Sequence, residues 1–329
     1  MQLATVKPAA DLKLIRSCSI WRALEVVGDV PTMLILEAFW LGERRFDGFQ
    51  QRTGLLKALL SQRLKTMTET GLLEKRQYSE RPARYEYWAT EKGRDLYWVA
   101  LAMLRWEKRW GAAATKFTVQ LDHLACGARN IDAVPFSRSA GVPFTARDVS
   151  WEHGPGMGWI APRHSRRRKQ RTDAESTESN LLDVIVQVLG DRWASLILRS
   201  IFTGFRRYDE IQKDAAIATN ILADRLQWLT GMGLIHKRLY SESPARYEYR
   251  LTETGIDYYP VLVMLMVWGD RWYVAPEGPP LVLEHRHTGL PLDPVMACSC
   301  CHQPLVPGEV AFHIRPMRRS QEEVRAQGA

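Results

Sequence analysis

A stretch of ten residues occurs twice in this chain, and it constrains the fold more than any other feature. Residues 78–87 and 240–249 share the sequence YSExPARYEY, with Arg in one copy and Ser in the other at the variable position. The offset between the copies is 162 residues, and it relates further pairs along the chain: Gly28 and Gly190, Arg44 and Arg206, Arg63 and Arg225, Trp110 and Trp272. A repeat of this length is a duplicated domain rather than a solenoid unit. A length of 329 residues also fits two domains.

Composition predicts a cytoplasmic protein with a polyanionic partner. The hydrophobic fraction of 46% is enough for two cores, and the net charge of +8 favours nucleic acid over membrane as the partner. No apolar run approaches the roughly 18–20 residues of a membrane span. Residues 1–20 lack the continuous apolar core of a secretory signal. Five cysteines, three of them within residues 298–301, do not resemble a disulfide framework.

Periodicity predicts a helix-turn-helix unit in each repeat. In the first repeat we expect helices over about 18–27, 33–40, 46–52, 57–70 and 90–110, and strands over 73–78 and 85–89. Leu60, Leu64 and Met67 form one apolar stripe on the fourth helix, so its other side chains face outward. In such a unit the second helix lies in the major groove of DNA.

The repeated ten residues predict a β-hairpin with an exposed tip, because alternating aromatic and polar residues flank a proline-containing turn. A basic hairpin after a helix-turn-helix unit is typical of a wing, whose tip cations contact phosphates. Arg81, Arg84 and Arg246 are the candidate wing residues.

We predict a set of DNA-contacting residues from these positions. It comprises Arg44, Arg45, Lys57, Ser61, Gln62, Arg63, Lys65, Arg81, Arg84, Arg206, Arg207, Thr219, Asn220, Arg225, Gln227 and Arg246. The alternative for the helix residues is a merely solvated face. For Arg63 and Arg225, which lie next to the buried stripe, the alternative is an ion pair with a carboxylate inside the domain.

Several motifs together resemble the HxlR-type helix-turn-helix regulators, a MarR-like winged-helix family. The motifs are Gly42-x-Arg44-Arg45-Phe46, Leu60-Ser-Gln-Arg63-Leu64, Pro82-x-Arg84-Tyr-Glu-Tyr87 and Thr90-Glu-x-Gly93, each with a counterpart in the second repeat. The resemblance covers about two thirds of the chain. It implies a dimeric fold that binds double-stranded DNA and controls transcription, most simply as a repressor.

The segment after each repeat resembles a small Cys/His ribbon that has lost one pair of ligands. His123-x-x-Cys126 corresponds to His285-x-x-Thr288, and Cys298-x-x-Cys301 corresponds to Ser137 and Ala140. We predict that zinc, if bound, is held by Cys298, Cys301 and His285. The alternative is a decayed ribbon held by apolar packing.

Cys18 stands ten residues before Gly28 and near the start of the first helix. Similar regulators often have a cysteine here, and in some of them it senses oxidants or electrophiles. We therefore name Cys18 as a candidate redox switch. The alternative is a small, half-buried core residue.

These interpretations combine into an α+β, mainly α chain with two tandem winged helix-turn-helix domains, each followed by a ribbon-like segment. The expected boundaries are 1–115, 116–149 (degenerate ribbon), 150–179 (basic linker), 180–275, 276–315 (Cys-rich ribbon) and 316–329 (disordered tail). No glycine-rich phosphate loop, HExxH motif or nucleophile with a base is present, so we expect no enzyme. A non-DNA interaction scaffold with a cysteine-based metal site is the alternative function.

Two assemblies are open for such a chain. The two repeats can pair within one chain, which would then be a complete DNA-binding unit. Alternatively, the repeats of two chains can pair in a homodimer. We favour the intramolecular pair, because a linker of this length keeps one repeat at about millimolar concentration around the other.

Overall fold

The computed structural model describes residues 14–111, 116–160 and 180–317. The basic run at 163–171 and most of the predicted tail lie outside these residues. The first repeat contains β1 (Ile15–Arg16), α1 (Ser19–Val27), α2 (Val30–Trp40), α3 (Phe46–Thr53), α4 (Lys57–Glu69), β2 (Leu73–Glu80), β3 (Ala83–Ala89), α5 (Glu91–Arg94) and α6 (Tyr97–Trp110). The second repeat contains α8 (Val184–Gly190), α9 (Arg192–Phe202), α10 (Tyr208–Ala215), α11 (Thr219–Gly231), β10 (Ile235–Glu242), β11 (Ala245–Leu251), α12 (Glu253–Asp257) and α13 (Tyr259–Trp272).

Local sequence signals explain the bounds of the central helices. Asp29 caps α2 by accepting a hydrogen bond from the Thr32 backbone N–H at 3.1 Å, and Asp191 caps α9 in the same way. Gly54, with a φ of 67°, ends α3 in the left-handed conformation that glycine adopts without strain. The next helix, α4, begins three residues later and turns its stripe of Leu60, Leu64 and Met67 into the core.

The two repeats pack on each other within the chain through α6 and α13. Their contacts are reciprocal: the Trp106 indole N–H donates to the Thr254 carbonyl at 2.9 Å, and the Trp268 indole donates to the Lys92 carbonyl at the same distance. Trp110 and Trp272 likewise donate to Asp257 and Asp95 of the opposite repeat, each at 2.8 Å. Each contact recurs at an offset of 162 residues, so the repeats are related by an approximate two-fold axis.

Two buried carboxylates of the first repeat cap a helix of the second. Glu37 accepts hydrogen bonds from the backbone N–H groups of Leu181 and Leu182, at 2.8 and 3.1 Å. Glu107 accepts from those of Val184 and Ile185 at the start of α8, at 3.2 and 2.8 Å. Burial raises the pKa of Glu37 to about 7, against the opposing effect of these hydrogen bonds.

The segments after the repeats form one intertwined β module rather than two separate ribbons, which corrects the sequence prediction. Its strands are β4 (Phe117–His123), β5 (Ala128–Ile131), β6 (Ala133–Ser137), β7 (Val142–Pro143), β8 (Val149–His153), β12 (Leu281–His285), β13 (Leu290–Pro291), β14 (Pro294–Cys298) and β15 (Val310–Pro316). They form three sheets with the orders β15-β4-β5, β14-β6-β7 and β13-β12-β8, so each sheet combines strands from both segments. At the middle of the β6–β14 pair, Pro135 lies opposite its own counterpart, Met296. The two segments have therefore exchanged strands about the two-fold axis.

The prediction of a linker over 150–179 is wrong for its first part. Residues 149–153 form β8, which pairs with β12, and β9 (Trp159–Ile160) pairs with β1. Gly154 and Gly156 donate backbone hydrogen bonds to Pro280 and Pro279, so this segment is held against the second repeat. The Gly-Pro-Gly composition suggested a linker, but the backbone pairing that orders these residues comes from strands more than 100 residues away.

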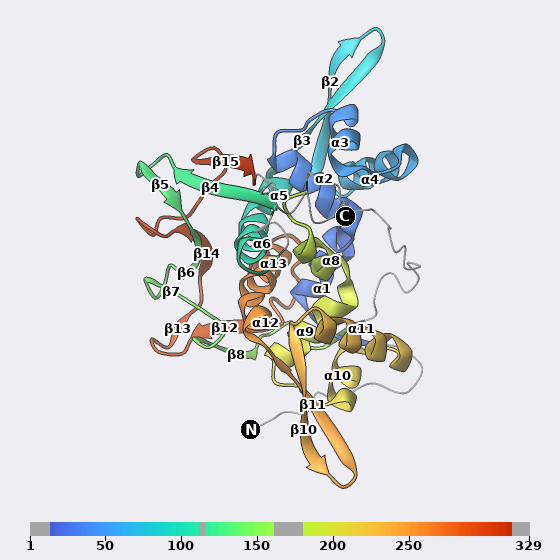
Figure 1. Cartoon of the computed structure of the whole chain (residues 1–329), viewed down its shortest axis with the longest axis vertical. Helices are drawn as coiled ribbons and strands as arrows, with labels where there is room; N and C mark the ends of the chain where they lie inside the picture. Colours follow the sequence, from blue (N-terminus) through green and yellow to red (C-terminus); the bar gives the residue numbers. More distant parts are fainter. Residues whose placement is uncertain (1–13, 112–115, 161–179, 318–329) are drawn as a thin grey trace, which may run out of the picture.

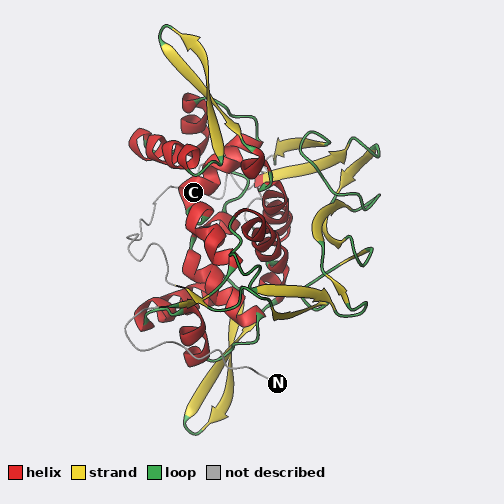
Figure 2. Ribbon diagram, turned by 180° about the vertical axis from the view of Figure 1, so that it is seen from behind, coloured by secondary structure: helices red, strands yellow, loops and turns green. Residues whose placement is uncertain are grey.

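The molecule is elongated, with a hairpin projecting from each end of a helical body (Figure 1). The β module lies along one side of this body, and α4 and α11 lie along the opposite side in both views (Figures 1 and 2). Within the described residues, no helix combines the length and apolar character that crossing a membrane would require.

The raised pKa of Glu37 makes stability depend on pH in a specific direction. The stabilisation from protonated Glu37 is complete below about pH 4.5 and is lost as the pH rises through the folded-state pKa of about 7. We expect Glu37→Gln to remove this loss, which is on the order of 2–3 kcal/mol. Urea unfolding at pH 5 and pH 8 tests the difference, with the exposed Glu69→Gln as the control. An unchanged pH dependence in Glu37→Gln would contradict the assignment.

Candidate nucleic-acid interface

The outward face of α4 carries the polar residues predicted from the sequence. Lys57, Ser61, Gln62 and Lys65 are all exposed, because the buried stripe holds the opposite face of the helix against α2. Lys65 lies 3.8 Å from Glu69 in an exposed pair, which leaves the ammonium group accessible. This face presents two cations and two neutral hydrogen-bonding side chains to solvent.

The corresponding face of α11 differs in charge. Thr219, Asn220 and Gln227 are exposed, as predicted. The Thr219 hydroxyl accepts a hydrogen bond from the Gln212 amide at 2.9 Å, so it is partly engaged within the repeat. Asp224, which stands where α4 has Gln62, is exposed and ion-paired with Arg225. The second face therefore lacks the lysines of the first and carries a carboxylate.

Arg63 and Arg225 do not belong to the exposed surface, and their prediction as DNA contacts is corrected here. The Arg63 Nε lies 3.0 Å from Asp29, and the Arg225 Nε lies 2.5 Å from Asp191. Both carboxylates are helix caps, so each arginine ties the outward helix to the cap of the central helix. Of the two alternatives left open by the sequence, the pair inside the domain is the one observed.

The arginines before the short helices divide into two kinds. Arg44 is half-buried: it donates to the Phe39 carbonyl at 2.6 Å, and its guanidinium carbon lies 3.9 Å from the Phe39 ring centroid. Burial also lowers the pKa of Arg44. Arg44 therefore closes the end of α2, which corrects its prediction as a phosphate contact. Arg45, Arg206 and Arg207 are exposed as predicted.

Arg45 and Arg207 support the base of each hairpin. The side chain of Arg45 is 61% exposed, pairs with Glu86 at 3.0 Å and lies over the Tyr78 ring. Arg207 lies over Tyr240 in the second repeat. These contacts position the cations between the outward helix and the hairpin while leaving much of each guanidinium in solvent.

The hairpins β2–β3 and β10–β11, called the wings from here on, have matching geometry. Arg84 pairs in register with Ser79, and Arg246 with Ser241, just below each tip. Arg81, Arg84 and Arg246 are all exposed. Each wing also carries a lysine over a tyrosine ring: Lys75 lies 3.7 Å from the Tyr85 centroid and Lys237 lies 3.8 Å from that of Tyr247. The sequence analysis missed these lysines, although the basic residues within the wing strands were a usable signal.

Leu56 is a further surface residue that the sequence analysis missed. It precedes α4 directly and is 78% exposed, although it is a large apolar side chain. In the second repeat the corresponding residue is Ala218. An apolar side chain at the start of such a helix can contact a thymine methyl group in the major groove. Its position before the first helical residue was the available signal.

Four possible metal ligands come together in the β module. The ligand atoms of His123, Cys126, Cys298 and Cys301 all lie within 4.8 Å of one another. The His123 Nδ1 is 3.2 Å from the Cys126 sulfur and 3.4 Å from the Cys301 sulfur. The prediction was right to include Cys298 and Cys301, but His123 and Cys126 complete the group.

His285 is not part of this group, which corrects its prediction as a metal ligand. Its Nδ1 lies 3.1 Å from the Thr288 hydroxyl, and its strand pairs with β8 instead. The error arose because the sequence places His285 near Cys298 and Cys301, whereas the strand exchange brings them to the first segment. The spacing His123-x-x-Cys126 was the signal that could have identified the second pair.

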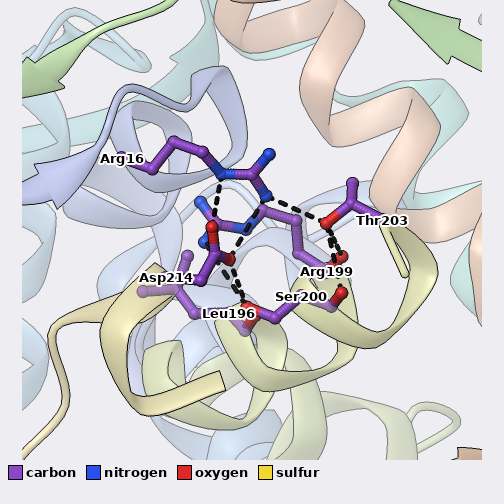
Figure 3. A network of polar contacts seen from close by, with 6 residues as sticks. All are labelled: Arg16, Leu196, Arg199, Ser200, Thr203 and Asp214. Carbon is purple, nitrogen blue, oxygen red and sulfur yellow. Dashed lines mark hydrogen bonds and ion pairs between the residues drawn. The ribbon is translucent and has the colours of Figure 1, made fainter. Parts of the chain in front are cut away.

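Cys18 is buried, with 2% exposure, beside an ionic network of the second repeat. Figure 3 shows Asp214 between Arg16 and Arg199, with nitrogen-to-oxygen distances of 2.6 and 2.5 Å. Burial opposes ionisation of Asp214, but the two guanidinium groups hold its pKa below the usual value. The Cys18 thiol interacts with the Arg199 side chain. A redox role for Cys18 stays a prediction, and the thiol lacks the solvent access that reactive cysteines have.

Comparison with known proteins agrees with this geometry. The model of the HxlR-like helix-turn-helix family matches residues 26–115 and 188–277, more than half of the chain. The chain belongs to the HxlR-like helix-turn-helix family. It is 41% identical over 116 residues to the uncharacterized HTH-type transcriptional regulator Rv3095 of Mycobacterium tuberculosis, which covers 35% of this chain and 73% of that protein. It is 29% identical over 110 residues to the HTH-type regulator YdeP of Bacillus subtilis, covering 32% and 86%.

Solved structures of this kind also match. Diamide-treated YodB from Bacillus subtilis is 28% identical, with a TM-score of 0.25, and the match covers 29% of this chain and 94% of that one. The family membership and the names of the relatives identify the chain as a DNA-binding transcriptional regulator of the helix-turn-helix class.

The inward arginines should act on stability. We expect Arg63→Ala and Arg225→Ala each to lower the free energy of unfolding by about 1–3 kcal/mol, because each leaves a partly buried capping carboxylate without its charged partner. Urea unfolding measures the change. Lys65→Ala is the matched control on the same helix, and its exposed pair should contribute less than about 0.5 kcal/mol. Arg63→Ala unfolding at the native midpoint would show that the Asp29 pair is unimportant.

Proposed function

We propose that one chain is a complete, sequence-specific DNA-binding unit that regulates transcription, most simply as a repressor in the cytoplasm. The observation that carries this proposal is the placement of α4 and α11 on the same side of the molecule, with a wing at each end (Figure 2). A dimeric helix-turn-helix protein presents two such helices from two subunits. Here the reciprocal contacts of α6 and α13 supply the same pairing within one chain.

The charges on this side support contact with phosphates. Arg45 and Lys57 of the first repeat, and Arg207 of the second, are exposed near the outward helices. The wing arginines lie farther out, where flanking phosphates would be met. Cations at these places position the protein on the duplex, while the side chains of α4 contact base edges. The exposed Leu56 adds an apolar contact at the start of α4.

The two outward faces support recognition of two different half-sites. Lys57 and Lys65 on α4 correspond to Thr219 and Gln227 on α11. Asp224 on α11 would repel phosphate and accept a hydrogen bond from a cytosine amino group. The first repeat would thus supply more of the electrostatic affinity, and the second would add discrimination between bases.

Selection of bound duplexes from a genomic pool, followed by gel shift of the selected site, tests the function itself. We expect a site of two half-sites whose centres lie about one helical turn apart. Binding no tighter to selected duplexes than to random DNA would refute sequence-specific regulation.

The wing arginines should act mainly through phosphate. We expect Arg84→Ala and Arg246→Ala to weaken binding to all sequences to a similar degree. Each should lower the slope of log affinity against log salt by about 0.9 for every phosphate that the variant no longer neutralises. Fluorescence anisotropy across a salt series measures the slope, and Arg129→Ala in the β module serves as a control that should leave it unchanged. An unchanged slope with altered base preference would show that the wing contacts bases.

The one-chain arrangement predicts unlike half-sites. We expect selected sequences to lack a palindrome, and a native mass measurement on a minimal duplex to give one chain per site. The substitution Asp224→Gln, which copies Gln62, should relax preference in one half-site only. Perfectly palindromic selected sites, or two chains on one minimal site, would point to a homodimer instead.

A further inference from the structure

We propose that His123, Cys126, Cys298 and Cys301 bind one structural zinc ion, and that this ion clasps the two halves of the chain. The proposal is independent of DNA binding. It rests on the donor set, on the distances within the group and on the origin of the ligands in two different segments.

The donor set is that of a closed structural zinc site. Three thiols and one imidazole are a ligand combination that tetrahedral zinc uses in such sites. Each pair has the spacing of two intervening residues, in His123-x-x-Cys126 and Cys298-x-x-Cys301. Thiolate donors also favour zinc over magnesium or calcium, which take oxygen ligands.

The distances agree with one ion at the centre of the group. A tetrahedron with Zn–S of about 2.3 Å and Zn–N of about 2.0 Å has donor-to-donor distances of about 3.4–3.8 Å. The His123 Nδ1 lies 3.2 and 3.4 Å from the sulfurs of Cys126 and Cys301, and the sulfurs of Cys126 and Cys298 are 4.0 Å apart. All three distances bracket the expected range. The four donors need to move by only a few tenths of an ångström.

Backbone groups around the cysteines favour thiolate. The Cys300 N–H points to the Cys298 sulfur at 3.4 Å, and the backbone N–H of Ala128 bonds to the Cys126 sulfur. Hydrogen bonds from the backbone to ligand atoms orient the ligands of metal sites and stabilise their charged form. His123 and Cys298 are buried, so the ion would be shielded from solvent on one side.

The ligands come from both halves of the chain because of the strand exchange. His123 ends β4 of the first segment, while Cys298 ends β14 of the second. At the positions related by the two-fold axis, His285 faces Thr288, and the cysteines are replaced by Ser137 and Ala140. Each segment has kept one pair of ligands, and the exchange brings the two retained pairs into one site. The chain therefore holds one ion rather than two.

Metal analysis of the full chain and its variants tests the proposal. Protein purified without chelator should contain one zinc per chain by elemental mass spectrometry. His123→Asn and Cys301→Ser should each reduce this to none, whereas the controls His285→Asn and Cys300→Ser should retain it. His123→Cys should also retain zinc, because it restores a ligand. Far-UV circular dichroism checks that each variant is folded.

The clasp is tested by combining the ligand variants. Both singles should lower the thermal midpoint, and the double variant His123→Asn with Cys301→Ser should lower it no further, because the two ligands act through the same ion. Additive effects would separate the two halves and overturn the clasp. Zinc retained in His123→Asn, zinc absent from His285→Asn, two ions per chain, or a disulfide without metal would each overturn the site.

Discussion

The packing of α6 against α13 is the contact on which the rest of the structure depends. It buries apolar faces too large for either repeat alone and aligns four indole N–H groups with acceptors of the opposite repeat. Buried donors of this kind need partners, so the hydrogen bonds select one relative orientation among the many that apolar contact would allow. Once that orientation is set, α4 and α11 face the same side, and the segments after α6 and α13 meet on the other.

Fusion of the two repeats allows each copy to change by itself. In a homodimer every substitution appears twice, whereas here the charges of one pair are reversed: Glu37 and Arg52 in the first repeat correspond to Arg199 and Asp214 in the second. Glu37 has become a cap for residues 181–182, and Asp214 has become the centre of a buried ionic network with Arg16. The same freedom explains why the outward faces differ and why each β segment has lost a different pair of ligands.

The arginines show how position decides between structure and surface. Arg63 and Arg225 lie on the outward helices, yet each reaches back to the carboxylate that caps the central helix. Arg45 and Arg207 lie near the bases of the wings and keep much of their guanidinium in solvent. A helix held to the body by such pairs presents its exposed side chains rigidly, and rigid presentation lowers the entropy cost of binding.

Much of the architecture was determined by the sequence alone. The offset of 162 residues indicated the duplication, the Asp29 cap and Gly54 delimited the helices, and the proline-containing repeat indicated the wings. These signals are local, because caps, turns and apolar stripes act over a few residues. The strand exchange, the inward turn of Arg63, the burial of Cys18 and the joining of His123 to Cys301 were decided only by tertiary structure. Each depends on a contact between segments that neither segment specifies by itself, since a strand or a ligand pair carries no record of which distant partner will complete it.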